Sequence, residues 1–225
     1  SKTVQMGGGM SPGATGAMPE FDRLGEFRVI EEIGRGGMGV VYLAEQESLD
    51  RKVAVKVLPR LSFLDETAVR RFRTEARIAA NLLHPGIIPV YGAGEQDGFL
   101  YYAMQYVRGV GWDELVKRLA LVCSYEQPQA AASGGYSKNF LTAMSQELVQ
   151  ERESGRGPDQ GYLDGQPSPL RHPAFYRQVA AMSAKACRAL EYAHSKGALH
   201  RDIKPANLML DENGDTWIAD FGLAK

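Results

Sequence analysis

The sequence predicts an α+β fold, and three observations support that prediction. Between Phe27 and about Val107, β-branched and aromatic runs alternate with turns in the order strand, glycine-rich turn, strand, strand, helix, strand, strand. Residues 175–194 carry apolar residues at helical spacing. Further on, Asn213-Gly214 separates two short apolar runs, which is a strong signal for a β-hairpin. Strands gathered in a first unit and helices in a second are typical of α+β proteins.

The composition is that of an ordinary globular protein. The 225 residues are 44% hydrophobic and 24% charged, and the formal net charge of -1 gives no electrostatic reason to expect nucleic acid or an anionic membrane as a partner. No apolar run approaches the roughly 20 residues needed to cross a bilayer. Because Cys123 and Cys187 suggest neither a disulfide framework nor a metal-ligand spacing, we expect a cytoplasmic protein, whose longer parent could be anchored to a membrane elsewhere.

Composition also divides the chain. Residues 1–24 are rich in Gly, Met and Pro without periodicity, which predicts a disordered segment, and residues 25–107 form the strand-rich unit. Residues 108–225 form the second unit. Within it, residues 125–172 show little periodicity outside "FLTAMSQELVQE", so we expect an inserted, largely mobile loop with one short helix. A partner-binding or regulatory element is the alternative for this insert.

Two segments have the apolar spacing of amphipathic helices. The first is "ETAVRRFRTEARIAANLL", and the second follows the insert and should end near Lys196-Gly197. The first apolar stripe consists of Val69, Phe72, Ala76, Ala79 and Leu83, and the second of Phe175, Val179, Met182, Ala186, Ala189 and Ala193.

The stretch "IGRGGMGVVYLAE" sets Gly34, Gly36 and Gly39 in a G-x-G-x-x-G frame. A dinucleotide-binding version would need a helix to begin at the glycines, but the residues that follow favour a strand. The glycines therefore turn a hairpin. Backbone without side chains can approach phosphates closely and donate N–H groups to their oxygens. A purely structural glycine hairpin is the alternative.

The stretch "RKVAVKVL" predicts a strand with two different faces. Alternation puts Ala54 and Lys56 on one face, and Val53, Val55 and Val57 on the other. A small residue beside a cation suits a flat ring next to a phosphate, whereas an exposed strand lysine is the simpler interpretation.

The carboxylate of Glu75 should lie on or beside the buried stripe of the first helix. A charge in that position needs a partner. Lys56 is one candidate, and a surface pair with Arg71 is the alternative.

A two-residue loop at Asn213-Gly214 would set Asn207 opposite Asp220, with Cα atoms roughly 5 Å apart. Two oxygen-bearing side chains there can share Mg²⁺, which takes few protein ligands and keeps room for phosphate and water. Two exposed turn residues are the alternative. In the preceding loop, Asp202 could accept a proton from a hydroxyl, and Lys204 could offset charge on a transferred phosphoryl group.

These motifs, in this order and at these distances, resemble the protein kinase family, and "IKPAN" resembles its serine/threonine branch. The glycine loop "GRGGMG" resembles bacterial Hanks-type members of that branch. The resemblance implies Asp202 as catalytic base, Lys204 as the lysine that neutralises phosphate, and Asn207 and Asp220 as metal ligands. It implies that Met104 is the gatekeeper and that His200 has a packing role. The residues it implies around ATP are Ile33, Gly34, Arg35, Gly36, Gly37, Met38, Gly39, Val40, Val41, Ala54, Lys56, Glu75, Met104, Gln105, Val107 and Met209, with the backbone of Gln105 and Val107 facing adenine.

The resemblance implies a bilobal fold with a five-stranded antiparallel sheet and one helix in the first lobe, and a mostly helical second lobe. It also implies Mg²⁺-dependent transfer of the ATP γ-phosphoryl group to Ser or Thr hydroxyls of a protein. Family members continue past "DFG" with further helices. We therefore expect this chain to bind ATP at best, to expose an apolar patch on the helix of residues 175–194, and to be either marginally stable or self-associating.

Two other functions stay open at this point. One is a pseudokinase-like regulatory or interaction module that binds nucleotide, which the retained Lys56, Asp202, Asn207 and Asp220 argue against. The other is a dinucleotide-binding oxidoreductase, which the strand after the glycines disfavours.

Overall fold

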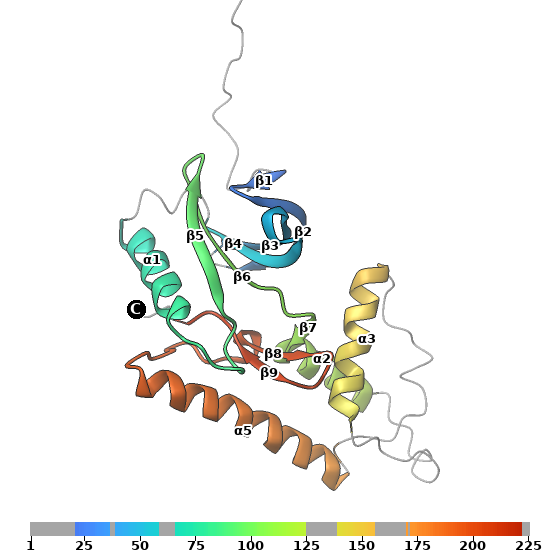
Figure 1. The fold of residues 1–225 in the computed structure, drawn as a ribbon. Coiled ribbons are helices and arrows are strands. Elements are labelled where there is room, and N and C mark those ends of the chain that lie inside the picture. Colours follow the sequence, from blue (N-terminus) through green and yellow to red (C-terminus); the bar gives the residue numbers. More distant parts are fainter. Residues whose placement is uncertain are drawn as a thin grey trace, which may run out of the picture.

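A computed structural model describes residues 21–36, 39–58, 66–124, 139–155, 170 and 172–221. Within helix α1 it describes the backbone but not the side chains of Ala68, Arg71 and Glu75. The chain forms two lobes (Figure 1): strands β1–β6 with α1 make one, and helices α2, α3 and α5 with strands β7–β9 make the other. This is the α+β arrangement that the sequence predicts.

The first lobe is built on an antiparallel sheet of six strands in the order β1-β2-β3-β4-β6-β5. The prediction of five strands missed the short β1, which pairs with β2. Residues 21–24 thus belong to the fold and not to the lead-in, and the Phe21 ring packs edge-on against Tyr42 and Phe99. The strands are β1 Arg23–Leu24, β2 Phe27–Gly36, β3 Gly39–Gln46, β4 Arg51–Val57, β5 Val90–Gln96 and β6 Phe99–Gln105.

The two faces of β4 differ as predicted. Val53, Val55 and Val57 lie in one buried cluster, beneath the curled sheet, whereas Ala54 lies in another with residues of α1. Lys56 is on the Ala54 face and only 4% exposed, so it is not a solvent-facing strand lysine. Removal of this much side chain from water requires that the charge be compensated.

Helix α1, Glu66–Ala80, covers this second face of the sheet. Phe72, Ala76 and Ala79 are buried, as the stripe predicts. Leu83 is 75% exposed, contrary to the prediction. The reason is that the helix ends at Ala80, and the turn that follows sends Leu82 into the core in its place.

The second lobe contains a three-stranded sheet, in the order β7-β8-β9, and three long helices. No helix in the described part of the chain is long and apolar enough to cross a membrane. The elements are β7 Gly109–Gly111, α2 Trp112–Ser124, α3 Phe140–Ser154, α5 Pro173–Ser195, β8 Leu208–Asp211 and β9 Thr216–Ile218, with a short 3-10 turn η5 at Pro205–Asn207. A similar turn, η1 at Glu47–Leu49, lies in the first lobe between β3 and β4.

Helix α5 has the predicted position. His172 caps its start by accepting a hydrogen bond from the Ala174 N–H, and Gly197, with φ +74°, follows its end. All residues of its predicted stripe are buried except Val179, which is 37% exposed, and Tyr176 beside it is 57% exposed. This face therefore has apolar groups in water, in line with the predicted exposure.

The predicted short helix within the insert is confirmed and is more firmly packed than expected. It is α3, which buries Phe140, Met144 and Val149 against the second lobe. The predicted mobility concerns residues 125–138 and 156–169, which lie outside the described part of the chain.

The predicted register of the β8–β9 hairpin is wrong by one residue. Leu208 pairs with Ile218, so Asn207 lies opposite Ala219, whose N–H donates to the Asn207 carbonyl at 3.0 Å. The loop has three residues because the Asp211 carboxylate accepts the N–H groups of Asn213 and Asp215, and Gly214 adopts φ +83°. Asp220 is the next residue along and stays beside Asn207 in the fold.

Candidate active site

A cleft of about 210 Å³ separates the two lobes and is lined by both. Its walls are mainly apolar, and small residues at Gly34 and Ala54 on one side leave space opposite Met209 on the other. Two apolar surfaces that face each other across a cleft suit a flat ring. The predicted contact residues that line the cleft are Ile33, Gly34, Val41, Ala54, Met104, Gln105, Val107, Met209 and Asp220.

The connection between the lobes forms the back of the cleft. Met104 is 8% exposed and ends this connection at the sheet. The N–H of Gln105 donates to the Pro89 carbonyl at 3.0 Å, so that group is engaged within the fold. Backbone recognition of a ring at this edge is therefore left to other groups of the segment, including those of Val107.

Lys56 crosses the cleft to the second lobe. Its Nζ lies 2.8 Å from Oδ1 of Asp220, and the two side chains are 5% and 27% exposed. The Tyr102 hydroxyl donates to the same oxygen at 3.4 Å. The predicted pairing of Lys56 with Glu75, and the alternative pairing of Glu75 with Arg71, both lie outside the described side chains. The salt bridge with Asp220 joins two motifs that are 164 residues apart in the sequence.

A second group of polar side chains adjoins Asp220. Lys204 Nζ donates to Oδ2 of Asp202 at 2.7 Å, and Asn207 Nδ2 donates to the Asp202 carbonyl at 2.8 Å and to Oδ2 at 3.2 Å. The hydrogen bond from Lys204 is the main cause of the lowered pKa of Asp202, and Asn207 adds to it. Asp202 is thus a carboxylate at neutral pH, able to accept a proton.

His200 is a structural residue, as predicted. Its ring is 2% exposed and packs against Phe221 at 4.7 Å between centroids. The Asp202 N–H donates to Nδ1, so Nε2 carries the proton and donates to the Ala219 carbonyl at 2.8 Å. Burial lowers the pKa of His200 and keeps the imidazole neutral. The ring thereby fixes the backbone of the segments that carry Asp202 and Asp220.

The two predicted metal ligands retain free oxygens. The Asn207 amide turns its nitrogen toward Asp202, which leaves the amide oxygen on the other side, and Lys56 occupies only Oδ1 of Asp220. An amide and one carboxylate suit Mg²⁺, which needs few protein ligands when phosphates and water supply the others. Among the described residues there is no group of three or more acidic, His or Cys side chains that would form an all-protein metal cage.

The glycine hairpin forms the outer edge of the first lobe. Gly36 and Gly39 pair across its end, and Gly37 and Met38 lie outside the described residues. Gly39 has φ +137°, and a Cβ there would lie 2.1 Å from the Val57 carbonyl oxygen. Only glycine fits this close approach of two strands.

Two predicted contacts of this hairpin need correction. The Val40 side chain is 1% exposed and lies in the cluster on the other face of the sheet, so it does not line the cleft. This follows from strand alternation, since its neighbour Val41 faces the cleft. Arg35 points its guanidinium at Glu32, with Nε 2.9 Å from Oε1, and not into the cleft lining.

The cleft also contains residues that the sequence did not suggest. Asp113 and Glu114, at the start of α2, line its mouth together with Arg152 of α3. Arg152 donates to both carboxylate oxygens of Glu114, at 2.9 and 3.0 Å. No sequence pattern links residues so far apart, so only the docking of α3 reveals this contact.

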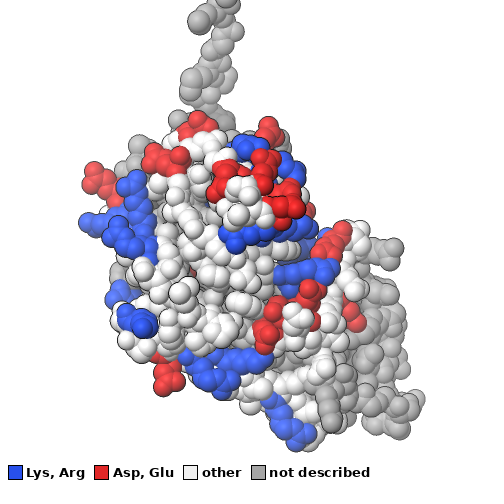
Figure 2. Space-filling model, viewed as in Figure 1, with Lys and Arg blue, Asp and Glu red and all other residues white. Residues whose placement is uncertain are grey.

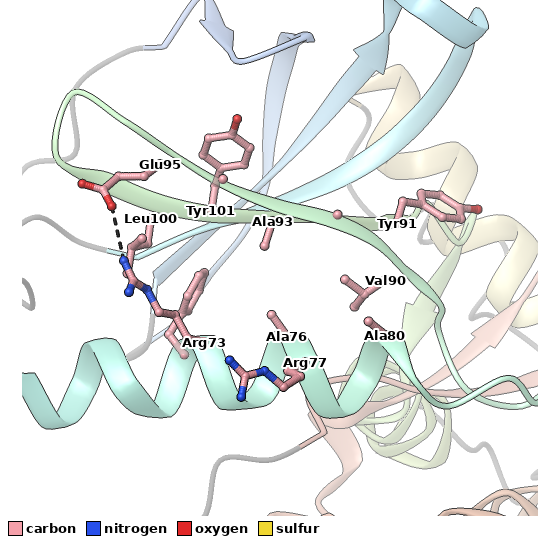
Figure 3. A pocket seen from close by; sticks show the side chains of 13 residues that line it. Arg73, Ala76, Arg77, Ala80, Val90, Tyr91, Ala93, Glu95, Leu100 and Tyr101 are labelled. Atoms are coloured by element: carbon pink, nitrogen blue, oxygen red, sulfur yellow. Dashed lines mark hydrogen bonds and ion pairs between the residues drawn. The ribbon is translucent and has the colours of Figure 1, made fainter.

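A second hollow lies on the outer side of the first lobe, between α1 and β5 (Figure 3). It is larger, at about 480 Å³, and small side chains such as Ala76, Ala80 and Ala93 leave it open. Its wall carries the ion pair between Arg73 and Glu95 at 3.4 Å. The cleft between the lobes is the better candidate because Asp220, which lines it, binds Lys56, and the adjoining Ala219 is bonded to Asn207.

Comparisons with known proteins agree with this geometry. Residues 27–225 match the family model described as protein tyrosine and serine/threonine kinase. The chain is 36% identical over 199 residues to the serine/threonine-protein kinase PknD of Chlamydia muridarum, covering 88% of the chain and 17% of that protein. It is 31% identical over 200 residues to the serine/threonine-protein kinase PrkC of Bacillus subtilis, covering 89% of the chain and 23% of that protein.

Solved structures give the same result for the fold. The Mycobacterium tuberculosis PknI kinase domain superposes with a TM-score of 0.53 at 26% identity, covering 90% of the chain and 62% of that domain. The chain thus spans about a fifth of the curated relatives' length and under two thirds of this solved domain.

Proposed function

The chain belongs to the protein tyrosine and serine/threonine kinase family, and from this premise we propose that it is the nucleotide-binding part of a serine/threonine protein kinase. The reaction is transfer of the ATP γ-phosphoryl group to a Ser or Thr hydroxyl of a protein. The observation that carries this proposal is the salt bridge of Lys56 with Asp220, which lines the cleft, at 2.8 Å. Asn207, bonded through its carbonyl to Ala219 beside Asp220, also bonds Asp202 at 2.8 and 3.2 Å.

Each residue has a role that follows from its contacts. Lys56, at the end of the cleft beside Asp220, supplies a positive charge for the phosphates of ATP. Asp202, held ionised by Lys204, accepts the proton as the substrate hydroxyl oxygen bonds to the γ-phosphorus and the bond to the leaving ADP oxygen breaks. Lys204 lies 2.7 Å from that carboxylate and offsets negative charge on the transferred group.

Asn207 and Asp220 would hold Mg²⁺ through the amide oxygen and the carboxylate oxygen that Lys56 does not occupy. The ion, when bound, neutralises charge on the phosphate oxygens. The chain's own contribution is to keep these two ligands beside each other. The backbone hydrogen bond from Ala219 to Asn207 at 3.0 Å joins the two segments that carry them.

A thermal-shift experiment tests nucleotide binding by the chain. We expect Mg-ATP to raise the melting temperature and ATP with a chelator to raise it less, because binding to the folded state alone stabilises it. The Asp220→Asn variant should lose the metal-dependent part of the shift. Equal shifts with and without the metal would contradict the proposed site.

Phosphotransfer separates the proposed kinase from a regulatory module that only binds nucleotide. The assay uses a protein that contains this chain together with the rest of its kinase domain. Labelled phosphate from ATP should appear on Ser or Thr of a substrate protein, and Asp202→Asn should abolish this transfer while leaving the Mg-ATP thermal shift intact. Nucleotide binding with no Asp202-dependent transfer in a protein that contains this chain together with the rest of its kinase domain would favour the regulatory module.

Self-association and a cytoplasmic setting belong to the same proposal. Exposed apolar side chains on and after α5 support self-association, with Tyr176 57%, Leu199 50% and Ile203 47% exposed. Neither Cys123 nor Cys187 is in a disulfide, in keeping with a reducing compartment. A monomeric profile in light scattering at micromolar concentration, with no binding of a hydrophobic dye, would contradict self-association.

A further inference from the structure

Helix α3 interrupts the chain between α2 and α5, yet it contacts the strands that form the floor of the cleft. In Figure 1 it stands beside β7 and β8, at the end of the segment that joins the lobes. Ser145, with an exposed fraction of 0%, donates its hydroxyl to the Leu210 carbonyl at 2.9 Å. Gln146 donates to the Glu212 carbonyl at 2.7 Å. The helix is therefore bonded to β8 and to the hairpin loop that follows it.

The two faces of these strands connect α3 to the cleft. Val110 pairs with Leu210, and both side chains are fully buried in the cluster that contains Met144 of α3. The next pair along, Gly111 and Met209, lines the cleft. Because neighbouring residues of a strand point to opposite faces, α3 supports from behind the same strands that face the nucleotide site in front.

The last turn of α3 reaches the mouth of the cleft. Glu151 pairs with the buried Arg118 of α2, Arg152 with Glu114 of α2, and Glu153 with Arg108, which directly follows the connection between the lobes. Arg108 also bonds Glu212 at 2.6 Å. Figure 2 shows acidic and basic side chains intermixed on this face beside α3. Successive helical residues point about 100° apart, so one turn holds three separate anchors.

We infer that the docking of α3 strengthens nucleotide binding and that Arg152 is a positioning residue for the site. Arg152 Nη2 donates to both carboxylate oxygens of Glu114 and so holds the start of α2 at the mouth of the cleft, and Glu153 holds the segment that leaves the connection between the lobes. Docking of α3 and nucleotide binding then stabilise each other by the same free energy, since linkage is reciprocal. A ligand or modification that releases α3 would weaken nucleotide binding.

The inference rests on the proposed nucleotide binding, and a titration of the 225-residue chain with Mg-ADP tests it. Arg152→Gln should raise the Kd about three- to fivefold, within the range expected for loss of one exposed ion pair. Gln150→Ala, on the exposed face of the same helix, is the matched control and should leave the Kd unchanged. The exchanged pair Arg152→Glu with Glu114→Arg should recover most of the lost affinity.

Amide hydrogen exchange gives an independent readout. Mg-ADP should slow exchange in residues 140–154, and this slowing should be smaller in Arg152→Gln. A lower melting temperature of that variant with an unchanged Kd and an unchanged exchange response would overturn the inference, because it would mean a purely structural role. If the wild-type chain binds no Mg-ADP at all, the proposed function itself fails and the inference fails with it.

Discussion

Two sets of ion pairs border the cleft, and they differ in their access to water. The inner pair, Lys56 and Asp220, meets at 2.8 Å with side chains 5% and 27% exposed. At the rim, Arg108 and Glu153 also meet at 2.8 Å, but their side chains are 44% and 49% exposed. Equal distances therefore describe unequal interactions, since water and salt can replace the partner at the rim but not inside the cleft.

This difference suggests that the inner pair and the rim pairs have different roles. The inner pair fixes the position of the charge that we propose receives phosphate, and no contact of the rim can replace it. The rim contacts are individually weak but several, so they hold α3 as a set. Changes to the inner pair should have large effects on binding, whereas single changes at the rim should have small ones.

The largest effect is expected for Lys56→Met. Loss of the cation leaves the Asp220 carboxylate without its salt bridge and removes the charge that we propose faces the phosphates, so we expect Mg-ATP binding to weaken at least about 30-fold. Lys52→Met, an exposed lysine on the same strand, is the control and should bind normally. Calorimetric titration of both variants measures the difference. Comparable weakening in the two would remove the distinction between inner and outer charges.

The buried salt bridge between Arg118 and Glu151 of α3 should, like the inner pair, be sensitive to the loss of one partner. Arg118 is 4% exposed, and Glu151→Gln would leave its guanidinium without a carboxylate, at a cost of about 2 kcal/mol in the free energy of unfolding. Urea unfolding measures this loss. Glu153→Gln, on the same helical turn but exposed, should cost clearly less. The same cost at both positions would show that burial does not decide the outcome.

The buried His200 predicts a pH dependence of intermediate size. Its pKa is lowered from 6.5 by burial, so the unfolded state takes up a proton at a higher pH than the folded state does. The stability from this residue is complete above pH 6.5 and declines as the pH falls toward the folded-state pKa. The slope is at most about 1.4 kcal/mol per pH unit for one proton.

Thermal unfolding between pH 7 and pH 5 should therefore show less dependence on pH in His200→Gln than in the wild type. An identical pH profile in the two proteins would indicate that His200 does not titrate in this range. Carboxylates with lowered pKa values, such as Glu153 beside Arg108, change the free energy of unfolding only at lower pH, near and below their ordinary pKa of 4.5.

The smallest effect is expected at the rim. Arg108→Gln removes contacts to Glu153 and Glu212, all of them exposed, so the loss of stability should be slight in dilute buffer and absent in 1 M NaCl, where charges are screened beyond about 3 Å. Unfolding curves at the two salt concentrations test this. A loss that persists in 1 M NaCl would mean that the guanidinium acts through packing.

The periodicity of apolar residues correctly predicted the buried faces of single strands and helices. The alternation of "VAVKV" gave the correct faces of β4, and helical spacing gave the buried side of α1 except at Leu83, where the helix had already ended. The hairpin register failed because the Asp211 carboxylate binds two loop N–H groups and adds a residue to the loop. Such a side-chain contact decides the register without altering the hydrophobic pattern.

The periodicity of apolar residues could not predict contacts between elements that are distant in the sequence. The sequence suggested that the Glu75 carboxylate needs a partner and offered Lys56, a pairing that lies outside the described side chains. The salt bridge of Lys56 with Asp220, which joins the two lobes, was not predicted. Arg152 carried no signal at all, because its role at the cleft depends on how α3 docks. The residues that share a motif were therefore predictable, and the residues that share only a location were not.

The most direct test of the account is a double-mutant cycle on Mg-ATP affinity, measured by isothermal titration calorimetry with Lys56→Met, Asp220→Asn and the double variant. If the two lobes act on one nucleotide and metal through this pair, the losses should be strongly non-additive, with the double variant binding little worse than the weaker single variant. Fully additive losses would contradict the claim that Lys56 and Asp220 form a single site.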